Sequence, residues 1–218
     1  MFYQFYLLFP FSNGNAKGVM FKYPALEVFT KTSPILTLST YIPVMVLLMI
    51  AGNHILGLSF GKVIIWYVSG FFSWTLIEYF MHRYLFHFVD ERPWTKRFHY
   101  LVHGIHHNYP RDEERLFMPP LPGLIYISLF LGIFWVILGN HAFYFLPGVM
   151  NGYLRYSFTH WSIHKGQPPK LLAPLWKHHN MHHYRYPEKA FGVSSMLWDY
   201  VFGTMPPKEE NRSTTVEK

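Results

Sequence analysis

The sequence contains no cysteine, and only 14% of its 218 residues are charged, against about 25% in an average soluble protein. The absence of cysteine excludes disulfide bonds and metal sites built from thiolates. The low charge content, combined with 50% hydrophobic and 20% aromatic residues, excludes an ordinary soluble globule and favours a membrane protein. The length of the chain favours one domain and also allows two small ones.

The basic residues form no continuous arm or stripe, so nucleic acid is not an expected partner. Lys and Arg together number 19 and Asp and Glu 12, which gives a formal charge of +7. An anionic membrane surface is the expected partner of this charge. The N-terminal stretch MFYQFYLLFPF lacks the basic start and cleavage site of a signal peptide and is too short to span a bilayer. Residues 1–33 are therefore predicted to form an interfacial segment.

Long uncharged stretches predict an all-α integral membrane fold with four transmembrane helices arranged as two hairpins. The predicted spans cover approximately residues 34–57, 62–82, 121–139 and 142–159. The sequence GLSFGK joins the first pair, and the second pair turns near Gly139 and Asn140. The fourth span has the weakest helical signal, because it contains Pro147, Gly148 and Gly152.

The segments 83–115 and 160–205 carry mixed charge and helical patterns, which predict a histidine-rich helical cap over the hairpins. Spans and cap together give one membrane domain, residues 34–205, followed by a disordered tail, residues 206–218. Of the 19 Lys and Arg residues, Lys62 alone lies in a predicted far-side turn, and Arg155 lies at a helix end. The positive-inside rule therefore predicts that the cap and both termini are cytosolic.

Eleven of the 14 histidines fall in four clusters, HRYLFH, HGIHH, HWSIH and HHNMHH, and all of these except His178 are predicted to bind metal. Helix positions i, i+3 and i+4 share one face, so each H-x-x-H-H cluster is predicted to point three imidazoles in one direction. His82 and His87 would lie about 140° apart on a regular helix, which predicts a break or distortion between them. The predicted metal ligands are His82, His87, His103, His106, His107, His160, His164, His179, His182 and His183.

Ten imidazoles are too many for one ion and divide naturally into five and five, which predicts a dinuclear centre. Structural zinc is typically tetrahedral and closed, whereas five imidazoles per ion favour a higher coordination number with room for a further ligand. Imidazole suits iron, zinc, copper and nickel, so ligand type alone does not select the metal. Two non-haem iron ions are expected, with zinc as a possible substitute in isolated protein. The alternative is a basic, pH-sensitive cap without metal.

Other polar residues are expected to support the ligands or to play no part. Metal-bound imidazoles usually donate their second N–H to a carboxylate or a carbonyl. Glu78, Asp112 and Asp199 are the candidates for this role, although Asp112 fits an ordinary surface carboxylate equally well. His54, His99 and His141 are expected not to bind metal, and His178 is expected either beside the ligands or at the surface.

Several aromatic residues near the cap allow two interpretations. They are predicted either to line a groove for an acyl chain or to form an interfacial belt. These residues are Tyr109, Trp161, Tyr184 and Trp198.

The order of the histidine clusters, with RLFMPP at 115–120 and FGVSSMLWDYVFGT at 191–204, resembles the fatty acid 2-hydroxylases. These belong to the membrane fatty acid hydroxylase/sterol desaturase superfamily, and the resemblance runs from Leu26 to Thr204. It implies that the ten predicted ligands hold a dinuclear metal centre. It also implies an O2-dependent monooxygenase that hydroxylates C2 of a long fatty acyl chain, free or in a ceramide-type sphingolipid.

Many eukaryotic members carry an N-terminal haem-binding electron carrier, and this sequence is predicted to be a short form without one. Electrons are then expected from a separate cytochrome or ferredoxin type of protein with its reductase. The location implied is the endoplasmic reticulum in a eukaryote or the inner membrane in a bacterium. A centre near the membrane surface would reach carbons close to a lipid's polar head, which also favours C2.

Two alternatives remain open from the sequence. One is a sterol or carotenoid hydroxylase, or a desaturase, with the same histidine clusters. The other is a membrane protein that binds or transports metal ions, although a transporter would carry its ligands near mid-membrane, whereas these clusters lie at helix ends and in the cap. Analysis of the lipid product discriminates among them.

Overall fold

The computed structural model describes residues 16–166 and 169–207, and within these residues every regular element is helical. The all-α prediction is therefore confirmed for this part of the chain. Residues 1–15 of the predicted interfacial segment and residues 208–218 of the predicted disordered tail lie outside the described residues. The described part of the N-terminal region contains one short helix, α2 (Pro24–Val28), which begins at a proline.

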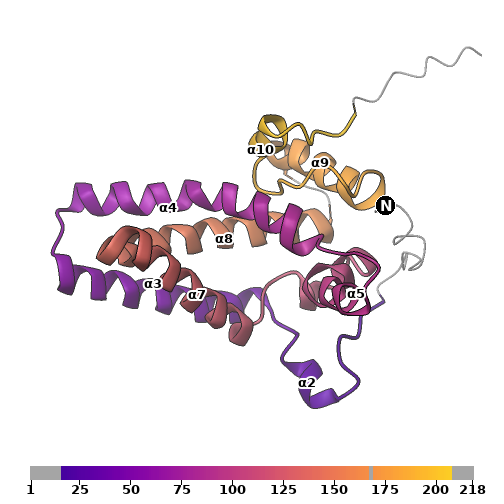
Figure 1. Ribbon diagram of the computed structural model, residues 1–218, viewed down its shortest axis with the longest axis horizontal. Coiled ribbons are helices and arrows are strands. Elements are labelled where there is room, and N and C mark those ends of the chain that lie inside the picture. The colour runs from indigo at the N-terminus through magenta and orange to yellow at the C-terminus, as the bar shows by residue number, and fades with distance from the viewer. Residues whose placement is uncertain (1–15, 167–168, 208–218) are drawn as a thin grey trace, which may run out of the picture.

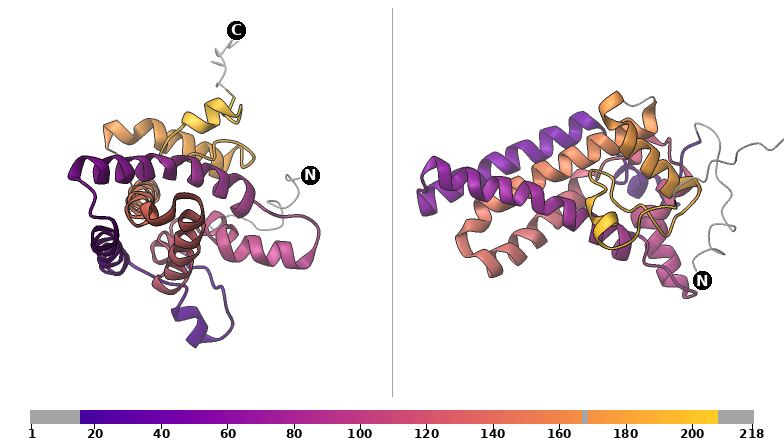
Figure 2. Two further views of the ribbon diagram at one scale, coloured as in Figure 1. Left: turned by 60° about the vertical axis from the view of Figure 1, so that its left-hand side comes forward. Right: turned by 90° about the horizontal axis from the view of Figure 1, so that it is seen from above.

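Four long helices form a bundle that extends in one direction from a group of short helices (Figures 1 and 2). Local sequence sets their ends. The Ser33 hydroxyl accepts a hydrogen bond from the Leu36 N–H at the start of α3, and Gly57, with φ of 52°, ends this helix in the left-handed conformation. The long helices are α3 (Pro34–Leu56), α4 (Phe60–Phe80), α7 (Pro120–Leu138) and α8 (Ala142–Lys165).

Three stretches are long and apolar enough to cross a membrane: Pro34–Leu56, Phe60–Phe86 and Glu113–Lys165. The third stretch contains 53 residues and includes both α7 and α8, which are separated by a 3₁₀ turn at Gly139–His141. The four long helices overlap the four predicted spans. A bundle with such apolar outer surfaces fits a membrane-embedded, all-helical protein.

Helix α8 packs against α3, α4 and α7 and carries five of the eight residues of the buried hydrophobic cluster in the bundle. The stretch around Pro147, predicted to be the weakest span, is continuous helix, and its glycines allow close packing. A Cβ atom on Gly148 would lie 1.9 Å from the carbonyl oxygen of Tyr67, and one on Gly152 would lie 2.4 Å from Cβ of Trp74. Small residues at these positions let α4 and α8 approach closely, as in membrane helix pairs.

The short helices lie together at one end of the bundle, where the helical cap was predicted (Figure 1). Helix α8 continues through Lys165 and so carries His160 and His164 into this region. The cap contains α5 (Pro93–His99), a π-helix (Tyr100–Gly104), α6 (Ile105–Asn108), 3₁₀ turns at Glu113–Arg115 and Lys170–Leu172, α9 (Ala173–Tyr184) and α10 (Leu197–Val201).

Candidate metal centre

The structure gathers all ten predicted metal ligands into two groups of five. In each group, one ring nitrogen from every histidine lies within 4.8 Å of the corresponding nitrogens of the other four. The first group consists of His82, His87, His103, His107 and His182. The second group consists of His106, His160, His164, His179 and His183.

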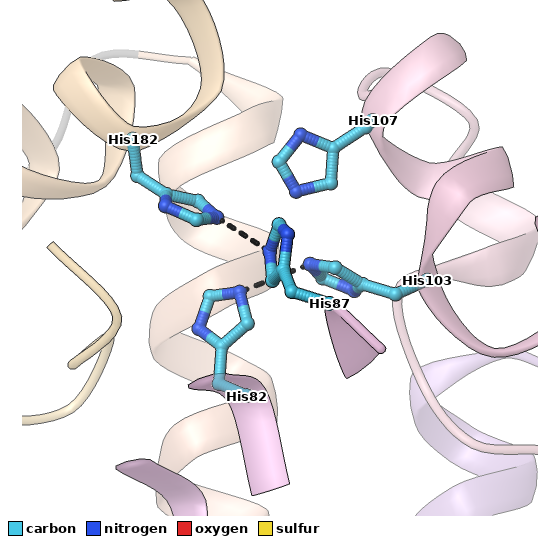
Figure 3. A group of neighbouring side chains, drawn as sticks. All are labelled: His82, His87, His103, His107 and His182. Atoms are coloured by element: carbon cyan, nitrogen blue, oxygen red, sulfur yellow. Dashed lines mark hydrogen bonds between the residues drawn. The ribbon is translucent and has the colours of Figure 1, made fainter. Parts of the chain in front are cut away.

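The first group is assembled from four separate elements, and its five rings converge on one space (Figure 3). His82 and His87 are brought together by a π-helix, Met81–Phe86, that continues α4. The backbone N–H of His87 donates to the backbone carbonyl of His82, five residues earlier, at 3.3 Å. Because this bond widens the helix, both side chains lie on the same side of it. The distortion predicted between these two histidines is therefore present, and its form is a π-helix.

The second group is assembled from α6, α8 and α9. Its composition corrects the prediction about the direction in which the imidazoles of each H-x-x-H-H cluster point. Each H-x-x-H-H cluster was predicted to point three imidazoles in one direction, but the structure divides each cluster between the groups. His106 belongs to the second group, whereas its neighbour His107 belongs to the first. Adjacent helix residues point about 100° apart, so one helix supplies both groups from two faces.

The spacing of the nitrogens suits a metal ion of more than four ligands. Nε2 of His82 lies 3.0 Å from Nε2 of His103, and Nε2 of His87 lies 3.1 Å from Nε2 of His182. In the second group, Nε2 of His183 lies 3.0 Å from Nε2 of both His106 and His179. Two nitrogens bound at right angles with bonds of about 2.1 Å would be about 3.0 Å apart.

Backbone carbonyls orient two rings of the first group so that a lone pair points inward. Nδ1–H of His82 donates to the Phe191 carbonyl at 2.5 Å, and Nδ1–H of His182 donates to the Lys189 carbonyl at 2.7 Å. A neutral imidazole that donates from Nδ1 has an unprotonated Nε2. Nε2 is therefore available to a cation in both residues, and this donor set fits a metal ion.

Burial keeps these imidazoles neutral. It lowers the pKa of His103, His107 and His183 well below the ordinary value of 6.5, and the neighbouring imidazoles lower it further. Only the neutral form of histidine binds metal, so the buried groups are ready to coordinate at physiological pH.

The three candidate carboxylates hydrogen-bond to backbone and to residues outside the two groups. Glu78 accepts from the Val193 and Ser194 N–H groups, on a segment adjoining Phe191. Asp199 accepts from the N–H groups of the same segment and from His178. Although burial opposes it, the hydrogen bond with His178, then those from Thr204 and Gly192, keep the pKa of Asp199 below its ordinary value.

Asp112 lies in a different cluster. It accepts a hydrogen bond from the Gly18 N–H and pairs with Arg115 at 2.9 Å, so it fastens the N-terminal segment to the cap. Arg115 also forms an ion pair with Glu27, so one guanidinium group links two carboxylates.

The remaining histidines lie outside the two groups. His178 is buried and hydrogen-bonded to Asp199 at 3.0 Å, beside the ligand-bearing face of α9. His99 is buried and donates from Nδ1 to the Phe86 carbonyl at 2.6 Å. His54 lies exposed on the last turn of α3, and the ring of His141 contacts that of Trp66, with the two planes 32° apart.

The sequence did not indicate the role of the backbone between Lys189 and Phe191. Carbonyl groups carry no side-chain signature, so no pattern could mark them as partners of His82 and His182. The motif FGVSSMLWDYVFGT, which lies beside them, was the nearest available signal.

An apolar cavity of about 610 Å³ adjoins both histidine groups. His82, His103, His106 and His160 contribute to its wall. Along α8 its lining extends from His160 to Leu146, which corresponds to about 21 Å at 1.5 Å per residue. A volume of this size is typical of a binding site for a small lipid-like molecule.

The walls of the cavity come from the bundle and from the N-terminal segment. Tyr41, Trp74, Ile127 and Val149 line it within the bundle, and Phe29 lines it from the segment after α2. The four aromatic residues predicted for an acyl groove are not among the described residues that line this cavity. The residues that line it come from the long helices instead, and the other interpretation of the four aromatic residues, an interfacial belt, stays a prediction.

Three comparisons relate this chain to known proteins. The family model for fatty acid hydroxylase matches residues 67–204. Over 152 residues the chain is 38% identical to the dihydroceramide fatty acyl 2-hydroxylase FAH2 of Arabidopsis thaliana. This match covers 69% of this chain and 64% of that protein. It is 37% identical to the fatty acid 2-hydroxylase of Rattus norvegicus, over 66% of this chain and 40% of that protein.

A solved structure described as full-length scs7p, with only the hydroxylase domain visible, superposes with a TM-score of 0.77. Its identity is 34%, and the match covers 85% of this chain and 71% of that chain. The family match includes the complete set of ten grouped histidines. The chain belongs to the fatty acid hydroxylase family.

Proposed function

We propose that this protein hydroxylates C2 of a long fatty acyl chain, either free or within a ceramide-type lipid. The observation that carries the proposal is the apolar cavity whose wall includes histidines of both groups. A chain bound there lies with its apolar carbons along α8 and one end beside the imidazoles. The relatives named as fatty acyl 2-hydroxylases support C2 as the position.

The ten grouped histidines would hold two metal ions, and iron is the ion that suits this reaction. When bound, the two ions would supply activation of O2, so that one oxygen atom enters the C2–H bond and the other leaves as water with two electrons from the separate donor protein, an oxidation that no side chain can perform. Zinc fits the same imidazoles and would occupy the site without supporting this chemistry.

The chain's own residues position the substrate and exclude water. The side chains of Trp74, Ile127 and Val149 form an apolar wall along the bundle, and such a wall holds an acyl chain by removing its surface from water. Tyr156 stacks on His160 with ring centroids 5.6 Å apart, so it fixes an imidazole beside the cavity. Holding the substrate and the ligands in fixed positions lowers the activation barrier of the reaction, because little freedom of movement remains to be lost on reaching the transition state.

In the membrane, we propose four spans in two hairpins, with the cap and both termini in the cytosol. The distribution of Lys and Arg supports this orientation. A polar lipid head at the cytosolic surface would then lie near the histidines, with its acyl chain in the cavity. A separate electron-donor protein would approach the cap from the cytosol.

The decisive experiment is expression with a reductase and a cytochrome or ferredoxin donor in a host without 2-hydroxylated lipids. Fragmentation of the product lipids by mass spectrometry should place a hydroxyl on C2 of the acyl chain. The His106→Ala variant serves as the inactive control. A new double bond, or oxygen on a sterol or carotenoid ring, would contradict the proposal.

A further inference from the structure

The backbone segment 189–194, named the carbonyl loop below, contacts the first histidine group and is itself held by two buried carboxylates. Its Lys189 and Phe191 carbonyls accept the Nδ1–H groups of His182 and His82 at 2.7 and 2.5 Å. These hydrogen bonds set the ring orientation and leave Nε2 unprotonated. The position of the carbonyl loop therefore determines where two of the five imidazoles point.

Asp199, at 0% exposure, fastens one side of the carbonyl loop. Oδ1 accepts from the Phe191 N–H at 2.9 Å and from the Thr204 hydroxyl at 2.7 Å. Oδ2 accepts from the Gly192 N–H at 2.7 Å and from His178 Nε2–H at 3.0 Å. Both oxygens are thus acceptors for two donors each, an arrangement that only a carboxylate satisfies completely.

Glu78 fastens the other side of the carbonyl loop from the last turn of α4. Oε1 accepts from the Val193 N–H at 2.7 Å and from the Ser194 N–H at 2.8 Å. Oε2 accepts from the Ser194 hydroxyl. A hydroxyl can reverse its role and become an acceptor, so this second contact would tolerate an amide.

The backbone of the carbonyl loop is itself unusual. Ala190, between the two residues whose carbonyls accept these hydrogen bonds, has φ of 58°, the left-handed conformation that residues with a side chain rarely adopt. Such conformations persist where surrounding contacts enforce them. A Cβ atom on Gly192 would lie 2.0 Å from the Ser195 carbonyl oxygen and 2.9 Å from Oδ2 of Asp199, so this position requires glycine.

The second histidine group has a different environment. Nδ1 of His106, His179 and His183 is buried without a hydrogen-bond partner among the residues that the structure describes. The carbonyl loop reaches His82 and His182, both of the first group. The carbonyl loop therefore orients two imidazoles of the first group, and none of its hydrogen bonds described here reaches the second group.

We propose that Asp199 and Glu78 are positioning residues for the first metal position alone, acting through the carbonyl loop. This inference rests on the proposed function, in which each histidine group binds one metal. Loss of either carboxylate contact frees the loop, releases the orientation of His82 and His182, and weakens metal binding at the first position. The second position keeps its ligands.

The test compares metal retention in the full chain, purified in detergent and loaded with Zn²⁺. In the Asp199→Asn variant an amide N–H₂ faces two donors that the carboxylate accepted, so the loop cannot keep all its hydrogen bonds. We expect one of the two zinc ions to be released into a chelator about 10- to 100-fold faster than in the unchanged protein, the range found when such supporting contacts are removed. The other ion should leave at an unchanged rate.

Glu78 provides a second, paired test that does not depend on how well Asp199→Asn folds. Glu78→Gln keeps an oxygen for the two backbone N–H groups and an amide for the Ser194 hydroxyl, so it should retain both ions. Glu78→Ala removes all three contacts and should lose the first ion quickly. Asp112→Asn alters a buried carboxylate at the N-terminal segment and should leave both release rates unchanged.

Fast release of one ion from Asp199→Asn and Glu78→Ala, with rescue by Glu78→Gln, supports the inference. Zinc release at an unchanged rate in both variants would overturn the inference. Faster release of both ions by the same factor would also overturn it, and in either case the dinuclear site itself would still be supported. An unchanged protein that binds no zinc under the same conditions overturns the proposed metal site itself. Elemental analysis of the loaded protein separates this result from the others.

Discussion

The rings of His107 and His183 stack with their centroids 4.3 Å apart and their planes 22° apart, although they belong to different histidine groups. One comes from α6 and the other from α9, so these short helices face each other across the site. The contact makes the two groups immediate neighbours.

Single histidine replacements should separate ligands from bystanders. His106→Ala and His182→Ala, one from each group, should abolish hydroxylation and each lower the bound metal from two ions toward one. His54→Ala and His141→Ala should retain most activity and both ions, because these residues lie outside the groups. Product analysis and elemental analysis of each purified variant provide the measurement. Equal loss in all four variants would mean that ligands and bystanders are wrongly assigned.

The metal-free protein should lose stability as the pH falls from about 7 to about 5. Burial lowers the pKa of His103, His107 and His183 in the folded state, whereas the unfolded chain titrates near 6.5. Below that pH the unfolded state binds protons that the folded state does not, so the free energy of unfolding decreases. Each such histidine contributes up to about 1.4 kcal/mol per pH unit.

Thermal unfolding of chelator-treated protein across this pH range measures the effect. His103→Gln should reduce the pH dependence, because one buried imidazole is removed. His54→Gln, which changes an exposed histidine, should leave it unaltered. A melting temperature independent of pH would contradict the prediction.

Filling the cavity far from the histidines should shorten the preferred acyl chain. Val149 lines the cavity on α8, about 16 Å along the helix from His160 at 1.5 Å per residue. Val149→Phe should shift hydroxylated products toward shorter chains while both metal ions remain bound. Competition between acyl chains of different length, read by mass spectrometry, measures the shift. Val136→Phe, at an 80% exposed site on α7, is the matched control and should not change the distribution.

The close contact of α4 and α8 should not tolerate a side chain at Gly148. Gly148→Val would place Cβ 1.9 Å from a backbone oxygen of Tyr67, and neither helix can yield without moving away from the other. We expect destabilisation of at least about 1–3 kcal/mol. Gly132→Ala on α7 meets no described atom within 4 Å and should be neutral or slightly stabilising. Thermal aggregation of detergent-purified variants, followed by size-exclusion chromatography, compares them.

The proposed topology places both ends of the chain on one side of the membrane. Tags at the N- and C-termini should therefore show the same accessibility to protease or antibody in sealed vesicles. A tag inserted between Gly57 and Phe60, in the turn joining α3 and α4, should show the opposite accessibility. Termini on opposite sides would show that α7 and α8 do not form two spans.

The helical class and the histidines of the site could be predicted because their signals are local. Uncharged stretches fix where long apolar helices occur, and the spacing of HGIHH and HHNMHH marks imidazoles that a helix can present together. The i, i+5 spacing of His82 and His87 even indicated a distorted helix. Such features depend on the geometry of a single element, which the order of residues specifies directly.

The assignment of each histidine to a group depended on packing between distant elements. His106 and His107 are neighbours in sequence, yet α8 approaches one and the π-helix after α4 approaches the other. The hydrogen-bond partners of Glu78 were also decided there, because they are backbone groups on a loop more than one hundred residues away in the sequence. Sequence alone determined which side chains could bind a metal ion. Tertiary structure decided which of these side chains lie in the same group. Their positions depend on the orientation of distant helices and on contacts with backbone carbonyls, and neither can be recognised in the residue pattern.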